Sequence, residues 1–201
     1  MVIAMPLHFY LRSPMADLTA VREPKTGLAF ASLSDSNLQL LGVGVRVKKI
    51  GPIPVKVYAV GLYGDARKLK KDVLAGLVRR GSGRRTLKLV FARDVTGPTI
   101  VRAFSSVKTV KTAVKENFKN TMLDLIGSSL KRHDAVSLSC PARAGSIHVL
   151  VEKKGQGLGS KTVDGHNLCD SVFDLFLGKA SVSPALLDDL QKRSQTTTSN
   201  K

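Results

Sequence analysis

Several chemical signatures are missing from this chain of 201 residues. Tryptophan is absent, and aromatic residues make up 5% of the chain. There is no aromatic-rich strand motif and no zinc-finger spacing, so the usual platforms for stacking or reading bases are missing. The chain also has no apolar run of about eighteen residues, the length that a membrane-spanning helix needs. We therefore expect neither nucleic-acid binding nor a transmembrane segment.

Motifs for metal, phosphate or hydrolytic chemistry are also missing. No P-loop, no HExxH helix and no GxSxG elbow is present, and the four histidines are scattered without a metal-ligand spacing. Cys140 and Cys169 form no CxxC pair. We expect them to be reduced, buried thiols, with a disulfide as the alternative. The sequence therefore predicts no metal and no cofactor, and nothing in it points to a catalytic triad.

Positive charge is abundant, and it is concentrated in the middle of the chain. The formal net charge is +17, and residues 41–120 carry nineteen basic and four acidic side chains. A strong positive field attracts anionic ligands, membranes and nucleic acids alike. Charge alone therefore does not identify a partner.

Hydrophobic periodicity predicts an α+β fold. Alternating residues predict strands at 28–33, 86–94 and 146–152, a continuation of the sheet at 99–104, and two long strands within 40–65. Helical periodicity predicts helices at 66–79, 105–126, 164–177 and 183–193. The connections are mostly too short for parallel crossovers, so we expect a largely antiparallel sheet with helices on one face.

The two long strands form the stretch around which the prediction is built. Gly51-Pro52 marks a tight turn between them. If the hairpin closes there, Arg46 lies directly across from Tyr58, and cross-strand partners point to the same face. A guanidinium and a phenol side by side are suited to holding a carboxylate. The alternative is a surface arginine beside a core tyrosine.

The predicted helix at 105–126 has one unusual member on its apolar side. Asn117 falls among Val110, Val114 and Phe118, where a buried amide needs hydrogen-bond partners. It either bonds to the backbone or lines a ligand cavity. A row of lysines follows another side of the helix, as a solvated face or as a docking surface for an acidic partner or anionic lipid head groups. These lysines are Lys108, Lys111, Lys115 and Lys119.

The order and spacing of several segments resemble the chalcone isomerase fold family, and most closely its branch of fatty-acid-binding proteins from plants and algae. The similarity extends from Val21 to Leu190. Its segments are VREPKTGLAF at 21–30, LLGVGVRVKKI at 40–50, VKVYAVGLYG at 55–64, LKLVFARDVTG at 87–97, KENF at 115–118 and LGKASVSP at 177–184. The resemblance implies an open-faced sandwich, with a ligand cleft between a large antiparallel sheet and a layer of helices.

The resemblance also assigns roles to single positions. Where the isomerases carry an Arg, a Thr, a Tyr, an Asn and a Thr or Ser, this chain has Arg46, Tyr58, Val110, Asn117 and Leu175. Three hydroxyl positions are thus altered, and neither Val110 nor Leu175 can hold a water or polarise a ketone. We therefore expect no isomerase activity.

The fatty-acid-binding branch matches the chain better. It implies that Arg46 and Tyr58 hold the carboxylate of a fatty acid, without any cofactor. The predicted ligand-binding set is completed by Val110, Asn117, Leu175 and Phe176, whose mostly apolar side chains suit an acyl chain. Two alternatives remain open. One is a chalcone–flavanone isomerase, an intramolecular lyase, with an altered active site. The other is a non-catalytic accessory protein that binds a polyketide synthase.

The expected organisation is a single domain with short extensions. We assign residues 21–193 to the domain, 1–20 to a leader that is disordered or the remnant of a targeting peptide, and 194–201 to a polar tail. Relatives in plastids and this leader favour the plastid stroma, with the cytoplasm as the alternative. We expect a monomer.

Overall fold

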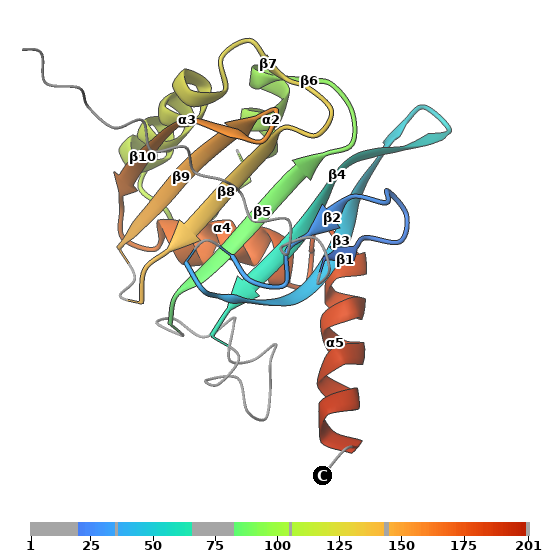
Figure 1. Cartoon of the computed structure of the whole chain (residues 1–201). Coiled ribbons are helices and arrows are strands. Elements are labelled where there is room, and N and C mark those ends of the chain that lie inside the picture. The colour runs from blue at the N-terminus through green and yellow to red at the C-terminus, as the bar shows by residue number, and fades with distance from the viewer. Residues whose placement is uncertain (1–19, 35, 66–82, 105, 143–144, 200–201) are drawn as a thin grey trace, which may run out of the picture.

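The computed structural model describes residues 20–34, 36–65, 83–104, 106–142 and 145–199. The predicted helix at 66–79 and the leader, except for Ala20, lie outside these residues. The described chain has the predicted α+β architecture, an antiparallel sheet with helices packed on one face (Figure 1). None of the helices in this part of the chain is long and apolar enough to cross a membrane.

Six strands form the main sheet, and every neighbouring pair is antiparallel. In spatial order they are β10 (Gln156–Asp164), β9 (Ser146–Lys153), β8 (Ala135–Cys140), β5 (Arg85–Phe91), β4 (Ile53–Gly64) and β3 (Gln39–Ile50). Two short pairs accompany the sheet. They are β1 (Val21–Arg22) with β2 (Ala29–Phe30), and β6 (Val95–Thr96) with β7 (Ser129–Leu130).

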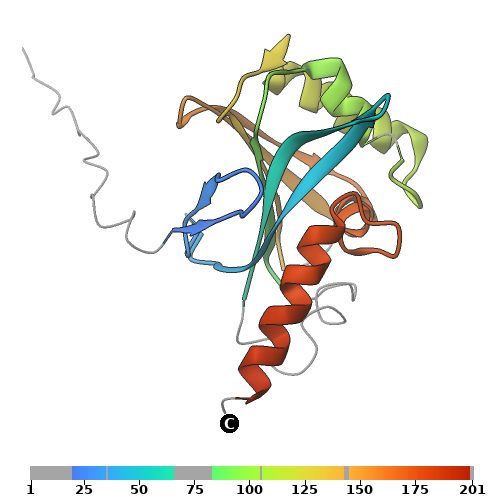
Figure 2. The same ribbon diagram turned by 90° about the vertical axis from the view of Figure 1, so that its right-hand side faces the viewer.

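Four described helices cover the sheet: α2 (Gly97–Ala103), α3 (Thr112–Ile126), α4 (Leu168–Leu177) and α5 (Pro184–Ser199). The main core lies between sheet and helices, where strand residues such as Leu62 and Leu89 pack with Met122 of α3 and Phe173 of α4. The β1–β2 pair lies on the opposite face (Figure 2) and covers a smaller core around Phe30. Burial of these apolar side chains is the main force that holds the layers together.

Helix α5 packs tightly against the edge strand β3. A Cβ atom added to Gly44 would lie 2.4 Å from the backbone nitrogen of Leu186, so only glycine admits the helix at this point. Two side chains of the α5 region bond to the free edge of β3. The Val43 amide donates to the Asp189 carboxylate at 2.8 Å, and the Ser183 hydroxyl donates to the Val45 carbonyl at 3.0 Å. These bonds occupy an edge that would otherwise be open to another strand.

Several predicted boundaries were wrong. The segment predicted to continue the sheet at 99–104 is helix α2, which begins around Pro98, a residue suited to a helix N-terminus. The long helix begins at Thr112 instead of residue 105. The helix predicted from 164 begins at Leu168, because Asp164 ends β10 and a turn at 165–167 separates the strand from the helix. Helix α5 continues beyond 193 to Ser199.

The prediction of reduced cysteines was also wrong. Cys140, at the end of β8, and Cys169, in the first turn of α4, form a disulfide with Cα atoms 6.0 Å apart. That separation lies in the usual range for disulfides. The sequence does not reveal the pair because its members are 29 residues apart, and only the packing of α4 against β8 brings them together.

Candidate functional site

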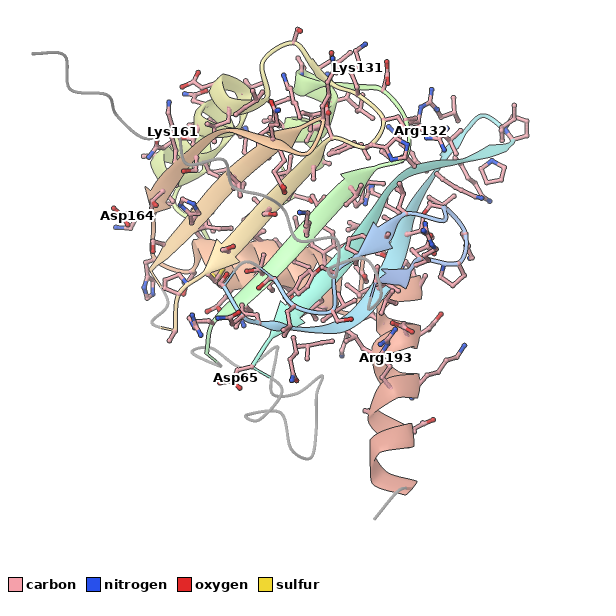
Figure 3. All side chains as sticks on the ribbon, in the orientation of Figure 1. Asp65, Lys131, Arg132, Lys161, Asp164 and Arg193 are labelled. Atoms are coloured by element: carbon pink, nitrogen blue, oxygen red, sulfur yellow. A yellow bond between two sulfur atoms is a disulfide. The ribbon has the colours of Figure 1, made fainter. Side chains whose placement is uncertain are left out.

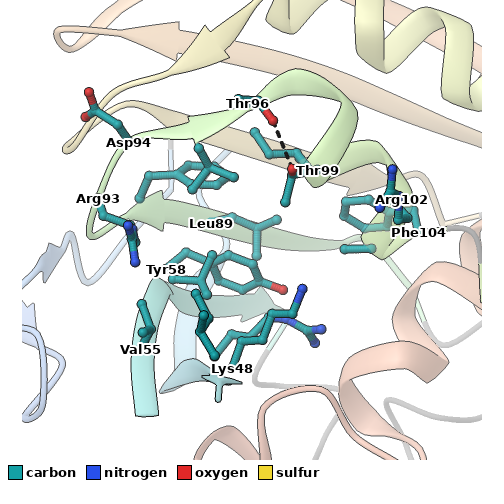
Figure 4. Close-up of a pocket in the computed structure, with 17 residues that line it drawn as sticks. Lys48, Val55, Tyr58, Leu89, Arg93, Asp94, Thr96, Thr99, Arg102 and Phe104 are labelled. Atoms are coloured by element: carbon teal, nitrogen blue, oxygen red, sulfur yellow. Dashed lines mark hydrogen bonds between the residues drawn. The ribbon is translucent and has the colours of Figure 1, made fainter. Parts of the chain in front are cut away.

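A cavity of about 490 Å³ lies at one end of the sheet, within the size range of small-molecule sites. Strands β3, β4 and β5 form one wall, and β6 with α2 forms the other. Figure 4 shows Tyr58 and Leu89 on the strand side, with Thr96 and Thr99 across from them. The lining residues are Arg46, Lys48, Ile50, Val55, Val57, Tyr58, Leu89, Phe91, Arg93, Asp94, Val95, Thr96, Thr99, Ile100, Arg102, Ala103 and Phe104.

The hairpin register places the two central residues side by side. Arg46 on β3 is the cross-strand partner of Tyr58 on β4, as the sequence predicts, and both line the cavity. The register then shifts, so that Val47 pairs with Lys56 and Val57 is left as an extra residue on β4. Such a bulge changes the direction of the following side chains. As a result Val57 and Tyr58, although consecutive, both line the cavity.

Tyr58 is buried at the base of this wall. Its ring contacts Phe91 at 5.7 Å and Phe176 at 6.4 Å between centroids. Burial raises the pKa of Tyr58 to about 12, although the charge of Arg46 and a side-chain hydrogen bond with it act in the opposite direction. The phenol is therefore neutral at physiological pH and can donate a hydrogen bond into the cavity beside a guanidinium.

The rest of the cavity's charge is almost entirely positive. Lys48, Arg93 and Arg102 join Arg46 in the lining, against the single carboxylate of Asp94. Asp94 is already engaged outside the cavity. It accepts a bond from Lys131 at 2.8 Å and one from the Arg132 amide, and these bonds lower the pKa of its carboxyl group. Figure 3 labels Lys131 and Arg132, the two residues that bond to Asp94. The field inside the cavity therefore favours an anion.

Apolar side chains supply most of the remaining surface. Leu89 and Phe91 come from β5, and Ile100 with Phe104 comes from the α2 region. One polar pair interrupts them, because the hydroxyls of Thr96 and Thr99 lie 2.9 Å apart and bond to each other. The cavity thus combines a cationic rim with an apolar interior, an arrangement suited to an amphipathic anion.

The other predicted site residues do not line this cavity. Phe176 lies behind it, buried against the Tyr58 ring. Val110 and Leu175 are partly buried against the main core. The prediction that Asn117 lies on the apolar side of the helix was wrong, because this residue is exposed on α3. The buried side of α3 centres on Phe118, and successive helical residues are turned by about 100°, which carries Asn117 away from the sheet.

Sequence reasoning missed much of the cavity. Lys48 could have been found, because it lies one alternation beyond Arg46 on the same face of β3. Val55 could not, because only the bulge at Val57 turns it to this face. Ile100 and Arg102 could not have been found, because the sequence pattern predicted a strand for their segment. Among the described residues, no group of three or more His, Cys, Asp or Glu side chains is placed to hold a metal ion.

Comparisons with known proteins agree with this architecture. A family model described as chalcone isomerase-like matches residues 27–190. Fatty-acid-binding protein 1 of Arabidopsis thaliana is 31% identical over 199 residues, covering 83% of this chain and 69% of that protein. Chalcone isomerase-like protein 1 of Humulus lupulus is 30% identical over 185 residues, covering 82% of this chain and 86% of that protein. A crystal structure of an Arabidopsis thaliana fatty-acid binding protein shares the fold, with a TM-score of 0.67 at 24% identity over 87% of this chain and 97% of that one.

Proposed function

Because this chain belongs to the chalcone isomerase-like family, we propose that it is a non-catalytic fatty-acid-binding protein whose cavity holds the carboxylate with Arg46 and Tyr58. The observation that carries the proposal is the pairing of these two residues on the cavity wall. Among the described residues Arg46 has no carboxylate partner. Its guanidinium is therefore free to pair with an acid that enters from outside.

The two donors complement each other chemically. A guanidinium presents two parallel N–H groups to a carboxylate and carries a full positive charge. The neutral phenol of Tyr58 adds one O–H donor without a charge of its own. Burial around Tyr58 reduces competition from water, so the hydrogen bonds to the ligand are stronger than at an open surface.

The acyl chain has an apolar path beside this polar end. Leu89, Phe91, Ile100 and Phe104 all belong to the lining, and each methylene that leaves water contributes roughly 0.8 kcal/mol. The similarity to fatty-acid-binding protein 1 of Arabidopsis thaliana supports the same ligand class. Medium to long fatty acids are therefore the expected ligands.

The proposal is tested by titrating a fatty acid and its methyl ester into the purified protein by calorimetry. Replacing Arg46 with Ala removes a charged hydrogen-bond partner, so we expect affinity for the acid to fall about 10- to 100-fold. The methyl ester has no charge to lose, and its affinity should be nearly the same for both proteins. Arg46→Lys keeps the charge but loses the two parallel N–H donors, so its affinity for the acid should lie between those of the native protein and Arg46→Ala.

Arg84→Ala is the matched control, because Arg84 is exposed at the opposite end of β5 from the cavity. It should bind the acid like the native protein. Native-like binding of the acid by Arg46→Ala would contradict the carboxylate clamp. Incubation with naringenin chalcone tests the non-catalytic part of the proposal, since ring closure well above the spontaneous rate would make the protein an isomerase.

A further inference from the structure

The free end of the β3–β4 hairpin exposes aliphatic side chains that the core does not use. Val47, Ile50 and Ile53 are 42%, 57% and 63% exposed. Elsewhere in the described chain such exposure occurs singly, at Leu33 before β3 and at Leu158 on β10. Single exposed aliphatic residues are ordinary on protein surfaces, whereas a group of them marks a contact site. We call residues 47–56 the hairpin tip.

The hairpin tip has a defined structure. Ile50 pairs with Ile53 across the two-residue turn Gly51-Pro52. Gly51 has a φ of 59°, and proline cannot follow with a positive φ, so the turn has the type II′ form that continues a hairpin smoothly. As cross-strand partners, the two isoleucines share one face. The tip extends past the neighbouring strands (Figure 1), which keeps these side chains away from the core.

Cations stand directly behind the apolar end of the hairpin. Lys48, Lys49 and Lys56 are all exposed, and the chain from Arg46 to Tyr58 contains no acidic residue. A bilayer with anionic lipids presents phosphates at its surface and acyl chains beneath them. Aliphatic side chains can enter the acyl boundary while lysines remain at the level of the phosphates. Ile50 and Ile53 lie at the turn, ahead of the lysines, so the end of the hairpin has both features in that order. Val47 lies farther back, on the face of β3 that points away from the cavity.

The same tip supplies part of the cavity lining. Lys48, Ile50 and Val55 line the cavity as well as belonging to the tip. We propose that the hairpin tip docks on anionic lipid bilayers, so that the cavity opens toward the membrane and fatty acids pass directly between the two. The docking stands on the exposed side chains alone, whereas the transfer rests on the proposed fatty-acid binding.

A second copy of the chain is a poorer occupant for this surface. A symmetric contact between two tips would bring the same residues together from both sides. Lys48 and Lys49 would then face their own counterparts across the contact, and like charges at close range repel. An anionic bilayer instead supplies the opposite charge together with an apolar layer of unlimited area.

The absence of tryptophan allows a direct test of docking. In the full chain, Ile53→Trp introduces a single indole at the tip, and Leu158→Trp introduces one at a comparably exposed site on the opposite edge strand. Figure 3 places Lys161, also on β10, at that far edge. With phosphatidylcholine vesicles containing phosphatidylglycerol, the emission of Ile53→Trp should shift to the blue and that of Leu158→Trp should not. A shift at Leu158→Trp alone would overturn the proposal.

Vesicle sedimentation measures which side chains carry the binding. Val47→Ser/Ile53→Ser removes aliphatic surface outside the cavity lining and should weaken binding at least about tenfold. The matched control Leu33→Ser/Leu158→Ser should leave it unchanged. Lys49→Gln/Lys56→Gln should weaken it about thirtyfold, because each lysine near an anionic surface contributes about one kilocalorie per mole. Binding should also fall with rising salt.

Lys108→Gln/Lys111→Gln makes the same change of charge near the start of α3, where the lysine row offers a rival surface. If this variant weakens vesicle binding and the tip variants do not, the tip is not the docking site. A protein that does not sediment with anionic vesicles also refutes the proposal. A dimer in sedimentation equilibrium that Val47→Ser/Ile53→Ser dissolves would mean that a second copy occupies the tip.

Failure of docking and failure of the proposed function give different results. Val47→Ser/Ile53→Ser should bind vesicles at least about tenfold more weakly yet bind free fatty acid in solution like the native protein, because neither residue lines the cavity. A native protein that sediments with vesicles but binds no fatty acid would refute the carboxylate site and the transfer, and leave docking intact. A native protein that binds fatty acid but ignores vesicles would refute docking alone.

Discussion

Two arginines at opposite ends of the sheet have contrasting surroundings. Arg85, at the start of β5, is 4% exposed, forms an ion pair with Asp170 and stacks over the ring of Phe173 at 4.6 Å. Arg46, at the cavity end, is only partly buried and has the neutral Tyr58 beside it. Among the described residues it has no carboxylate partner. One arginine has a carboxylate partner within the protein, and the other, under the proposed function, pairs with the carboxylate of the ligand.

An arginine side chain can thus serve either the stability of the fold or the binding of a ligand. Removing one partner of a buried ion pair is strongly destabilising, because it leaves an uncompensated charge inside the protein. The disulfide between Cys140 and Cys169 strengthens the same end, because Cys169 precedes Asp170 on α4. The cavity end lacks such an internal partner. We therefore expect substitutions at the two ends to separate stability from ligand affinity.

The largest effect is expected from breaking the internal ion pair. Asp170→Ala leaves the buried charge of Arg85 without its carboxylate and should lower the free energy of unfolding by about 3 to 5 kcal/mol. Arg46→Ala should lower it by less than about 1 kcal/mol. Urea denaturation followed by circular dichroism measures both. Asp124→Ala is the control, because Asp124 forms an exposed pair with Lys161 at 3.1 Å, and such pairs contribute little.

If Asp170→Ala and Arg46→Ala destabilise the protein equally, the contrast between the two ends is wrong. Affinity for fatty acid provides the reverse comparison. At a temperature where Asp170→Ala is still folded, it should bind like the native protein, whereas Arg46→Ala should not.

The cavity end was more predictable from the sequence in its strands than in its helices. The pairing of Arg46 with Tyr58 followed from strand alternation and one glycine–proline turn, both of which act over a few residues. Lys48 followed the same alternation and could have been included, whereas Val55 faces the cavity only because of the bulge at Val57. Residues from α2 could not be placed, because the segment 99–104 has strand-like composition, whereas in the structure most of it belongs to a helix that contacts α3.

Two other failures have different physical causes. Asn117 was assigned to the buried side because the helix was expected to begin at residue 105, and a helix that begins at Thr112 centres its buried face on Phe118. The Cys140–Cys169 disulfide depends on the β8–α4 contact. Strand β8 itself was not predicted, so no pattern in the sequence could bring the two cysteines together.

A smaller effect is expected when the cavity end is titrated. The pKa of Tyr58 is raised to about 12 from the ordinary tyrosine value of 10.0. Above pH 10 the phenol of the unfolded chain loses its proton while that of the folded protein keeps it. The stability contributed by this burial is therefore fully present below pH 10 and is lost as the pH rises through 12, by up to about 2.7 kcal/mol.

Tyr58→Phe lacks this ionisation, so denaturation curves between pH 9 and pH 12 should show the native protein losing stability faster than the variant. Parallel pH profiles would mean that Tyr58 is not held in its neutral form by burial.

The smallest effect distinguishes the two donors of the proposed clamp. Tyr58→Phe removes one neutral hydrogen bond but leaves Arg46, so affinity for a fatty acid should fall by about 1 kcal/mol, or about fivefold. This is less than the loss expected for Arg46→Ala, because the phenol carries no charge.

Tyr63→Phe is the matched control. Tyr63 is also buried, but its hydroxyl donates to the Ala31 carbonyl at 3.0 Å on the other face of the sheet. It should therefore lose stability without losing affinity. If calorimetry shows the two variants binding equally well, Arg46 holds the carboxylate without Tyr58, and the contrast with Arg85 reduces to the presence or absence of an internal acid.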